Sequence, residues 1–307
     1  MYPRKIASVV ELAIAPGVQR ALESGNPVVA LESAVITHGL PGPAALEAVR
    51  RQSDACEQGG AVPAVVAVFE GTLHIGLSLD QCSALATHQD NAKVSPWNLA
   101  SAISSPGFGG TTVAATVGAA AAAGIRVVST GGIGGVHPGA NGLDVSADLT
   151  ELGRRRVCVI CAGPKSTLDA GATLERLETL GVPVIGWRSS LLAGFLAVSA
   201  GLRLPARADT IDALGSIVRH HWALGGAGLV VSQPIAGELA LSRSELSADG
   251  ELAVRGPERT PAELRRLQAR LGDRVIQANV ALLERNAALA GVLSAALSSA
   301  PAGNARG

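Results

Sequence analysis

Lysine is almost absent from this sequence. Of the 25 lysine and arginine residues among 307, only Lys5, Lys93 and Lys165 are lysines. Arginine is permanently charged and cannot act as a nucleophile, whereas a desolvated lysine can lose its proton and attack a carbonyl. Lys165 follows an apolar run that predicts a buried strand, and open α/β sheets bind ligands beyond such strand ends. Lys93 and Lys165 are therefore candidate catalytic residues, with chance retention of two surface lysines as the alternative.

Aromatic residues are also scarce, at 2%, although hydrophobic residues make up 48% of the chain. The core must therefore be closely packed Ala, Val, Leu and Ile, which favours helices against a sheet. The formal net charge is +0 without a basic run, which argues against a duplex-binding protein. No stretch of about eighteen uncharged residues has the bulk of a membrane span, and the N-terminus is a poor signal peptide. We expect a cytoplasmic enzyme that binds a small molecule, and neither nucleic acid nor a membrane.

The four cysteines form no evident metal or redox site. Cys158 and Cys161 make a C-x-x-C pattern, but it lies inside a predicted strand, where residues three apart face opposite sides of the sheet. Two thiolates on opposite faces cannot share a metal ion. We therefore expect all four cysteines, including Cys56 and Cys82, to be reduced and structural.

Apolar runs alternate with helical patterns along the chain, as in α/β proteins. Strands are predicted at 28–31, 125–129, 157–162, 182–186 and 228–231, with a hairpin of 64–69 and 72–75. Helices are predicted at 43–58, 79–87, 110–123, 166–180 and 210–224, with two more within 260–296. The predicted fold class is α/β, a three-layer α/β/α arrangement with a central mixed sheet. One domain is expected over 1–297, with a disordered tail at 298–307.

Glycine-rich turns provide candidate anion sites. Residues 107–112 place glycines and hydroxyls at a predicted helix start, where free N–H groups and the helix dipole favour a phosphate. A second turn, 129–139, follows a predicted strand and includes His137. Its Gly131-x-x-Gly134 spacing resembles a dinucleotide fingerprint, but no helix is expected to follow, so NAD binding is not predicted. Ordinary tight turns are the alternative.

Two carboxylates complete the candidate set. Glu32 directly follows the predicted strand 28–31, where partial desolvation would raise its pKa and let it transfer protons. An ordinary ion pair is the alternative. Asp148 could bind Mg²⁺ or Mn²⁺ beside a phosphate, with water as most of the other ligands. Alternatively, Ser146 or Asp148 simply caps a helix that begins nearby.

Five segments carry a family resemblance: ALESAVITHGLP from Ala30, GGTTVAAT from Gly109, TGGIGGVH from Thr130, DVSADLTEL from Asp144 and AGPKS from Ala162. Together they resemble the pseudouridine-5'-phosphate glycosidase family, also called the indigoidine synthase A family, over about residues 8 to 295. The resemblance implies an α/β/α fold, a homotrimer and Mn²⁺ as cofactor. It also implies reversible cleavage of pseudouridine 5'-phosphate to uracil and ribose 5-phosphate.

The same resemblance implies a role for individual residues. Lys165 matches the catalytic lysine that forms an imine with C1' of the ring-opened sugar. Glu32 matches the proton-transferring glutamate, Lys93 the second active-site lysine and Asp148 the metal-binding aspartate. The positions that match substrate-binding residues are Thr111, Thr112, Val113, Thr130, Gly131, His137, Ser146 and Asn279.

The chemistry of a C-glycosidic bond agrees with these roles. Such a bond has no heteroatom leaving group to protonate, so two-carboxylate glycosidase chemistry does not break it. An imine at C1' permits cleavage once the base carbon takes a proton from Glu32. Lys93 would disfavour a second positive charge and keep the Lys165 amine neutral. A non-catalytic sugar-phosphate binding protein is the alternative from another class, but it would need neither an imine-forming amine nor a proton donor.

Two loops depart from the family pattern. Ser95-Pro-Trp-Asn98 stands where Ser-Arg-Arg-Asp is usual, and Leu192-Ala-Gly-Phe-Leu196 stands where Phe-Pro-Ala-Phe-Tyr is usual. If Pro96, Trp97 and residues 191–196 line the crevice beyond C1', they form an apolar wall there. Two acceptors therefore remain open: uracil, or a larger aromatic natural product that the enzyme C-ribosylates with ribose 5-phosphate.

Overall fold

A computed structural model of the chain describes residues 12–139, 143–246 and 259–299. Its sheet has the strand order β1-β4-β3-β2-β7-β8-β11-β9-β10, and β5 and β6 extend it from β3. Most neighbours are parallel, but β3 runs antiparallel to β4 and β6, so the sheet is mixed as predicted. The strands are β1 (Ala13–Ile14), β2 (Val28–Leu31), β3 (Val62–Phe69), β4 (Thr72–Ile75), β5 (Ala92–Val94), β6 (Gly109–Thr111), β7 (Val127–Ser129), β8 (Cys158–Cys161), β9 (Val184–Trp187), β10 (Ala206–Ala208) and β11 (Leu229–Ser232).

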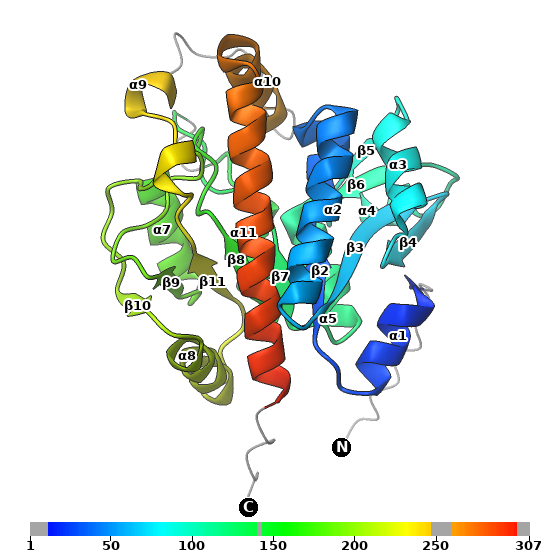
Figure 1. Ribbon diagram of the computed structural model, residues 1–307, viewed down its shortest axis with the longest axis horizontal. Coiled ribbons are helices and arrows are strands. Elements are labelled where there is room, and N and C mark those ends of the chain that lie inside the picture. Colours follow the sequence, from blue (N-terminus) through cyan, green and yellow to red (C-terminus); the bar gives the residue numbers. More distant parts are fainter. Residues whose placement is uncertain (1–11, 140–142, 247–258, 300–307) are drawn as a thin grey trace, which may run out of the picture.

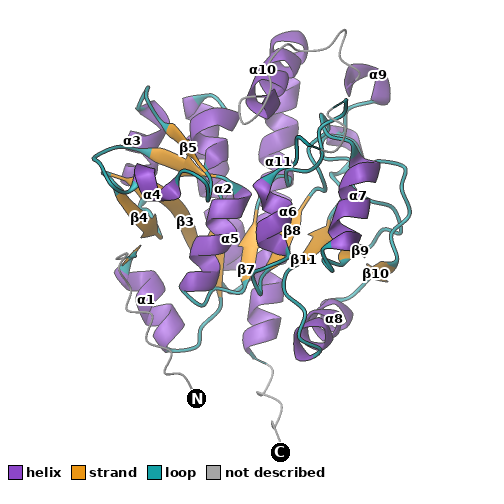
Figure 2. Cartoon of the chain, turned by 180° about the vertical axis from the view of Figure 1, so that it is seen from behind, coloured by secondary structure: helices purple, strands orange, loops and turns teal. Residues whose placement is uncertain are grey.

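Helices cover both faces of the sheet and make the three layers that the sequence predicts. In Figure 1, α2 and α11 lie side by side on the near face, and Figure 2 shows α5, α6 and α7 on the opposite face. The α-helices are α1 (Pro16–Glu23), α2 (Gly42–Gln58), α3 (Leu79–Thr87), α4 (Leu99–Ala102), α5 (Val113–Ala122), α6 (Ala147–Leu152), α7 (Ala170–Thr179), α8 (Ile211–Ala223), α9 (Arg243–Leu246), α10 (Arg259–Leu271) and α11 (Asp273–Ser298). A π-helical turn, η1 (Val35–Gly39), and a 3-10 turn, η2 (Gly237–Leu239), complete the elements.

The two faces of the sheet carry separate apolar cores. Cys161 packs in the core that contains α5 and α6, whereas Cys158 packs in the core that contains α2 and α11. The prediction that these thiols face opposite sides is therefore confirmed. All four cysteines are buried and unpaired with one another, and burial raises the pKa of the Cys161 thiol to about 12. They are structural residues rather than nucleophiles.

The local patterns located most elements, but not the strands that depend on distant partners. The hairpin of β3 and β4 is confirmed, and Glu70 and Gly71 both have positive φ at its turn. Lys93, expected in a loop, lies in β5, which pairs with β6. Residues 110–111, expected to begin a helix, belong to β6, and the helix begins after Thr112. This pairing joins segments far apart in the sequence, so a local pattern does not reveal it.

Helix α11 is the one described helix that is long and apolar enough to cross a membrane, a feature that the sequence analysis overlooked. In this fold 56% of the most apolar 18-residue stretch of α11 is buried, and the helix packs along α2. Gly291 makes this close packing possible, because a Cβ there would lie 2.7 Å from the Cys56 carbonyl oxygen. The helix therefore serves here as a core element. It continues to Ser298, and most of the predicted tail, from residue 300 onward, lies outside the described residues.

Candidate active site

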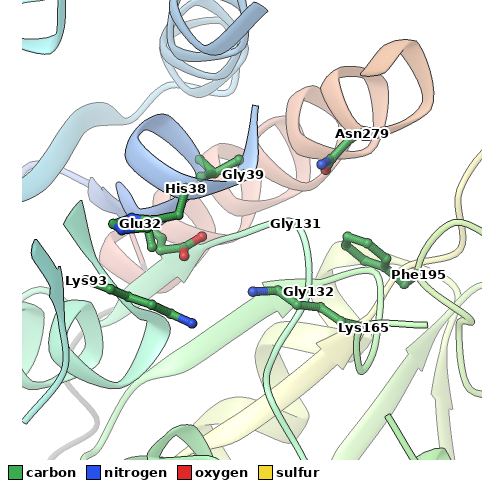
Figure 3. Close-up of a pocket in the computed structure, with 11 residues that line it drawn as sticks. Glu32, His38, Gly39, Lys93, Gly131, Gly132, Lys165, Phe195 and Asn279 are labelled. Carbon is green, nitrogen blue, oxygen red and sulfur yellow. The ribbon is translucent and has the colours of Figure 1, made fainter. Parts of the chain in front are cut away.

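The candidate catalytic side chains meet at one edge of the sheet. Glu32 directly follows β2 and Thr130 directly follows β7, while Lys165 lies four residues beyond β8. Lys93 comes from β5, which β6 attaches to the same sheet. Figure 3 shows the amines of Lys93 and Lys165 and the carboxylate of Glu32 directed toward a common space. The site thus lies at the carboxyl ends of parallel strands, where α/β sheets bind ligands.

Two adjoining hollows share this common space. The wide cavity has a volume of about 440 Å³, and the narrow recess, on the same measure, about 40 Å³. Glu32, Ala34, Lys93 and Lys165 line both of them. The other residues of the wide cavity are Ser95, Trp97, Thr112, Val113, Gly134, His137, Asp144, Val145, Ser146, Ala147 and Asp148. Those of the narrow recess are Val35, His38, Gly39, Gly131, Gly132, Phe195 and Asn279.

Glu32 is buried, with 5% of its surface exposed. Burial raises the pKa of its carboxyl, whereas the positive charge of Lys165 and a hydrogen bond from Thr130 oppose that rise. The Thr130 hydroxyl donates to Oε2 of Glu32 at 2.8 Å. The expected rise in pKa is therefore confirmed in direction. Among the described residues no ion pair within 4 Å involves Glu32, so the ordinary ion-pair alternative does not describe it.

Asp148 connects two segments that line the wide cavity. Its Oδ1 accepts a hydrogen bond from the backbone N–H of Ala114 at 2.8 Å, and its Oδ2 accepts one from Gly134 at 2.7 Å. The carboxylate thereby links the start of α5 to the glycine-rich turn after β7. Ser146 caps α6 by accepting from the N–H of Asp148 at 3.2 Å, so the predicted capping role of Ser146 is confirmed.

The chemistry of the donor set bears on which metal ion could bind here. Among the described residues no group of three or more His, Cys, Asp and Glu is arranged to hold a metal ion. Asp144 and Asp148 both line the wide cavity, and each oxygen of Asp148 keeps a second lone pair beyond its backbone bond. One or two carboxylates suit a hard ion that retains most of its water, such as Mg²⁺ or Mn²⁺, better than Zn²⁺.

The structure brings most of the predicted substrate-binding residues to the two hollows. Thr112, Val113, His137 and Ser146 line the wide cavity, and Gly131 and Asn279 line the narrow recess. Thr130 is not among the residues that line either hollow, but its hydroxyl donates a hydrogen bond to Glu32, which lines both.

Thr111 is the exception among these residues, because its side chain is buried away from both hollows. Its hydroxyl donates to the Val66 carbonyl oxygen at 2.6 Å and lies 2.9 Å from the Thr116 hydroxyl. Its hydroxyl is therefore used inside the core, below the site, and a contact of Thr111 with substrate stays a prediction.

The two departing loops contribute less to the walls than expected. Trp97 lines the wide cavity with 78% of its surface exposed, and Phe195 lines the narrow recess with a φ of 62°. Leu192 instead packs into the core, and neither it nor Pro96 is among the lining residues of either hollow. The predicted apolar wall is thus reduced to two separate aromatic side chains, one in each hollow.

Two titratable side chains of the site received no role from the sequence. His38 lines the narrow recess and Asp144 lines the wide cavity. Both belong to the segments that carry the family resemblance, so their positions in those segments were the available signal. What the sequence did not reveal is the π-helical turn that carries His38 beside Glu32.

Comparisons with known proteins identify the family. A family model described as indigoidine synthase A like protein matches residues 17–296. A pseudouridine-5'-phosphate glycosidase of Methylobacterium nodulans is 44% identical over 93% of this chain and 88% of its own length. One from Herpetosiphon aurantiacus is 43% identical over 94% and 99%.

Two solved structures are also similar, each with 33% identity over 94% of this chain and 97% of the other. The first is an indigoidine synthase A-like protein of Thermotoga maritima, with a TM-score of 0.86. The second is the prealnumycin C-glycosynthase AlnA in complex with ribulose 5-phosphate, with a TM-score of 0.84.

Proposed function

This chain belongs to the indigoidine synthase A-like family, and we propose that it reversibly cleaves the C–C glycosidic bond of pseudouridine 5'-phosphate. One observation carries the proposal: the amines of Lys93 and Lys165 and the carboxyl of Glu32 lie where two hollows meet. A bond between a sugar and a base that spans this junction would place its two carbons beside a nucleophile and a proton donor. Relatives that share nearly the full length of this chain are named for that activity.

The proposed reaction begins when the neutral Lys165 amine attacks C1' and the bond from C1' to the ring oxygen opens. Glu32 then protonates the base carbon that is bonded to C1'. The electron pair of the C–C bond returns to the base ring, while the lysine nitrogen lone pair forms the C=N bond of an imine. Water adds to the imine carbon and releases ribose 5-phosphate, and a proton returns to Glu32. Every step reverses in the synthetic direction.

The wide cavity suits the sugar phosphate. It contains the start of α5, a helix of 10 residues, where Thr112 and Val113 stand at the N-cap and first position. The positive end of the helix dipole favours an anion there, while the N–H groups of Ala114 and Ala115 are already bonded to Asp148 and to the Thr112 hydroxyl. His137 and Ser146 add polar groups to the same wall.

We further propose that a divalent ion, preferably Mn²⁺, binds on this wall through Asp148 and water, with Asp144 as the second carboxylate. When bound, such an ion would offset the negative charge of the phosphate and polarise oxygen atoms of the sugar. Asp148 also has a role without the ion, because it holds the N–H groups of Ala114 and Gly134 in place.

The narrow recess suits the base. Its small volume and the flat surface of Gly131, Gly132 and Phe195 fit one ring better than several fused rings. A Cβ on Gly132 would lie 2.6 Å from the Phe195 ring, so glycine is needed for this packing. Uracil is therefore the first candidate acceptor.

A larger aromatic acceptor is the second candidate. The exposed indole of Trp97 beside the wide cavity offers a stacking surface for it, and the similar structure of AlnA belongs to a C-glycosynthase. The enzyme would then run in the synthetic direction and C-ribosylate that acceptor with ribose 5-phosphate.

Assembly and location complete the proposal. We propose a homotrimer, because a mean hydropathy of +0.33 and the exposed Leu143 and Leu224 leave apolar surface that a closed ring could cover. We also propose that the protein is located in the cytoplasm. Light scattering at micromolar concentration measures the mass directly, and a monomeric mass would contradict the trimer.

Turnover of pseudouridine 5'-phosphate, followed by ultraviolet absorbance, tests the proposed activity. The reverse reaction of uracil with ribose 5-phosphate should form the same compound. A protein that binds ribose 5-phosphate but turns over neither pseudouridine 5'-phosphate nor an aromatic acceptor would instead be the non-catalytic sugar-phosphate binding protein.

A further inference from the structure

A π-helical turn carries His38 to the wall of the narrow recess. The turn, η1 (Val35–Gly39), begins three residues after Glu32, and both residues line that recess. Figure 3 shows the His38 side chain next to that of Glu32. A π-helical turn is rare and is frequently found at functional sites. The main chain thus adopts an uncommon conformation just where it brings an imidazole beside the proton donor.

The position of this turn is fixed by close packing on β6. A Cβ on Gly110 would lie 2.7 Å from the Ser33 carbonyl oxygen and 2.9 Å from the Ala34 Cα. Gly110 is also the partner of Lys93 in the ladder of β5 and β6. Ser33 and Ala34, which lead into the turn, therefore pack against Gly110, the residue of β6 that pairs with Lys93. The absence of a side chain at Gly110 permits this close approach.

The imidazole itself is held by the residue before it. The Thr37 hydroxyl and Nδ1 of His38 are 2.6 Å apart, so this ring nitrogen is engaged by a side chain of the same turn. The Thr37 hydroxyl can donate to the Ala34 carbonyl oxygen at 3.5 Å and accept from the Nδ1–H of His38, and in this tautomer Nε2 of His38 carries no proton and can accept. His38 is therefore an oriented group of the recess.

The proposed chemistry creates a need for a hydrogen-bond acceptor in this recess. When Glu32 protonates the base carbon, positive charge spreads over the ring to the conjugated nitrogen, which is N1 in uracil. The N1–H group then becomes more acidic, and an acceptor beside it stabilises the charge as it develops. A lysine ammonium group cannot accept a hydrogen bond, and the Lys165 nitrogen is bonded to C1' at this step. Among the described side chains that line the recess besides Glu32, His38 and Asn279 therefore remain as acceptors. An imidazole is the more basic of the two.

We propose that His38 accepts a hydrogen bond from the N–H of the base that is conjugated with the carbon protonated by Glu32. The proposal rests on the proposed function and adds a catalytic residue that acts on the acceptor instead of the sugar. The N1 proton is shared with His38 while the C–C bond breaks and stays with the base afterwards, so the step consumes no proton. Lys165 and the sugar phosphate side of the site do not depend on it.

A comparison of two substrates with two enzymes tests this role. Pseudouridine 5'-phosphate and its N1-methyl derivative are cleaved by the wild type and by His38→Gln. In the wild type we expect N1-methylation to lower kcat about 100-fold, the size typical of a general acid–base contribution. In His38→Gln the unmethylated substrate should be slower by about the same factor, and the further effect of N1-methylation should fall below about threefold.

Two other variants separate His38 from its surroundings. His220→Gln, on the exposed surface of α8, should leave the methylation effect of the wild type unchanged. Asn279→Ser should slow both substrates by a similar factor, because Asn279 is not the acceptor for N1–H in this proposal. Borohydride trapping of ribose 5-phosphate on His38→Gln, with intact-mass analysis, should match the wild type within about twofold, which shows that the folded sugar site persists.

Each contrary result has a distinct meaning. An N1-methylation effect that is equally large in His38→Gln and in the wild type, or one abolished by Asn279→Ser instead, overturns the role of His38 and leaves the proposed function intact. Loss of sugar-phosphate trapping in His38→Gln assigns the residue to the sugar side and also overturns it. If the wild type traps ribose 5-phosphate but does not cleave pseudouridine 5'-phosphate, the uracil assignment itself fails, and the role at N1 with it.

Discussion

The Thr130 hydroxyl donates a hydrogen bond to Oε2 of Glu32 at 2.8 Å, and both side chains are almost completely buried. Two opposing effects meet in this pair. Burial disfavours the charged carboxylate and raises its pKa, whereas the hydrogen bond stabilises the carboxylate and lowers that pKa. Asn286 in turn donates to the Thr130 carbonyl oxygen at 2.8 Å, which fixes the position of the donor.

The pH dependence of cleavage should therefore respond to Thr130. Cleavage requires protonated Glu32, so kcat falls as the pH rises through the pKa of that carboxyl. Thr130→Val removes the bond that lowers this pKa, and the falling limb of the pH–rate profile should move to higher pH. Ser129→Ala, a change at the adjacent buried hydroxyl, is the matched control. An unmoved limb in Thr130→Val would show that Glu32 does not set this limb.

Lys165 should be the residue that carries the sugar. Borohydride reduction in the presence of ribose 5-phosphate should add one reduced sugar phosphate to the wild type, as seen by intact mass. Lys165→Ala should show no adduct. Lys93→Met should still form it, at a reduced rate, because the attacking amine remains. Undiminished adduct formation in Lys165→Ala would remove Lys165 from the mechanism.

The two carboxylates of the wide cavity should differ in their effect on stability. Asp144→Asn and Asp148→Asn should each weaken Mn²⁺ binding in a calorimetric titration and lower activity. Asp148→Asn should also cost about 1–3 kcal/mol of unfolding free energy, since an amide N–H₂ cannot accept from a backbone N–H. Asp144→Asn should leave Tm unchanged. Full activity after exhaustive chelation would contradict the metal site altogether.

Trp97 should limit the binding of the sugar phosphate. Among the described residues that line the wide cavity, only Lys93 and Lys165 carry amines, and Trp97 stands at its edge. Trp97→Arg should lower KM for pseudouridine 5'-phosphate about two- to fivefold through added attraction for the phosphate, with kcat little changed. Gln89→Arg, at an exposed residue outside the lining, is the control for nonspecific charge effects. A fall in kcat/KM for Trp97→Arg would instead assign the indole to acceptor binding.

Two helical glycines should respond oppositely to alanine. Gly291→Ala should lower the unfolding free energy by about 1–3 kcal/mol, because the new Cβ would lie 2.7 Å from the Cys56 carbonyl oxygen. Gly118→Ala, in α5, meets nothing closer than 3.7 Å and should raise it by about 0.5–1 kcal/mol. Chemical denaturation measures both values. Equal effects of the two substitutions would refute the close approach of α2 and α11.

The sequence predicted those features that short segments determine. Glu32 and Lys165 follow buried strands, and both the strands and the positions after them could be recognised from runs of apolar residues. The pattern around Ser146 and Asp148 indicated a helix cap at one of the two, and Ser146 is the one that caps α6. The layered fold followed from the alternation of such segments.

Features that depend on contacts between distant segments could not be predicted in this way. The hydroxyl of Thr111 looked available beside a glycine-rich turn, but Ser33, just after β2, and Val66, in β3, occupy it. The same holds for Asp148, whose two backbone donors come from α5 and from the turn after β7. Burial of Leu192 in the core removed most of the expected apolar wall. Each of these outcomes is decided by a partner that the local sequence does not contain.

Of the described residues, the narrow recess and the wide cavity share four: Glu32, Ala34, Lys93 and Lys165. A substitution at Val35 or Phe195 can therefore alter one compartment while the residues around the other keep their own contacts. Because the two hollows are built from largely separate residues, a few mutations could change the acceptor specificity during evolution. The residues that bind the sugar phosphate would then be inherited unchanged. Such a history would explain how a C-glycosidase and a C-glycosynthase could share one fold.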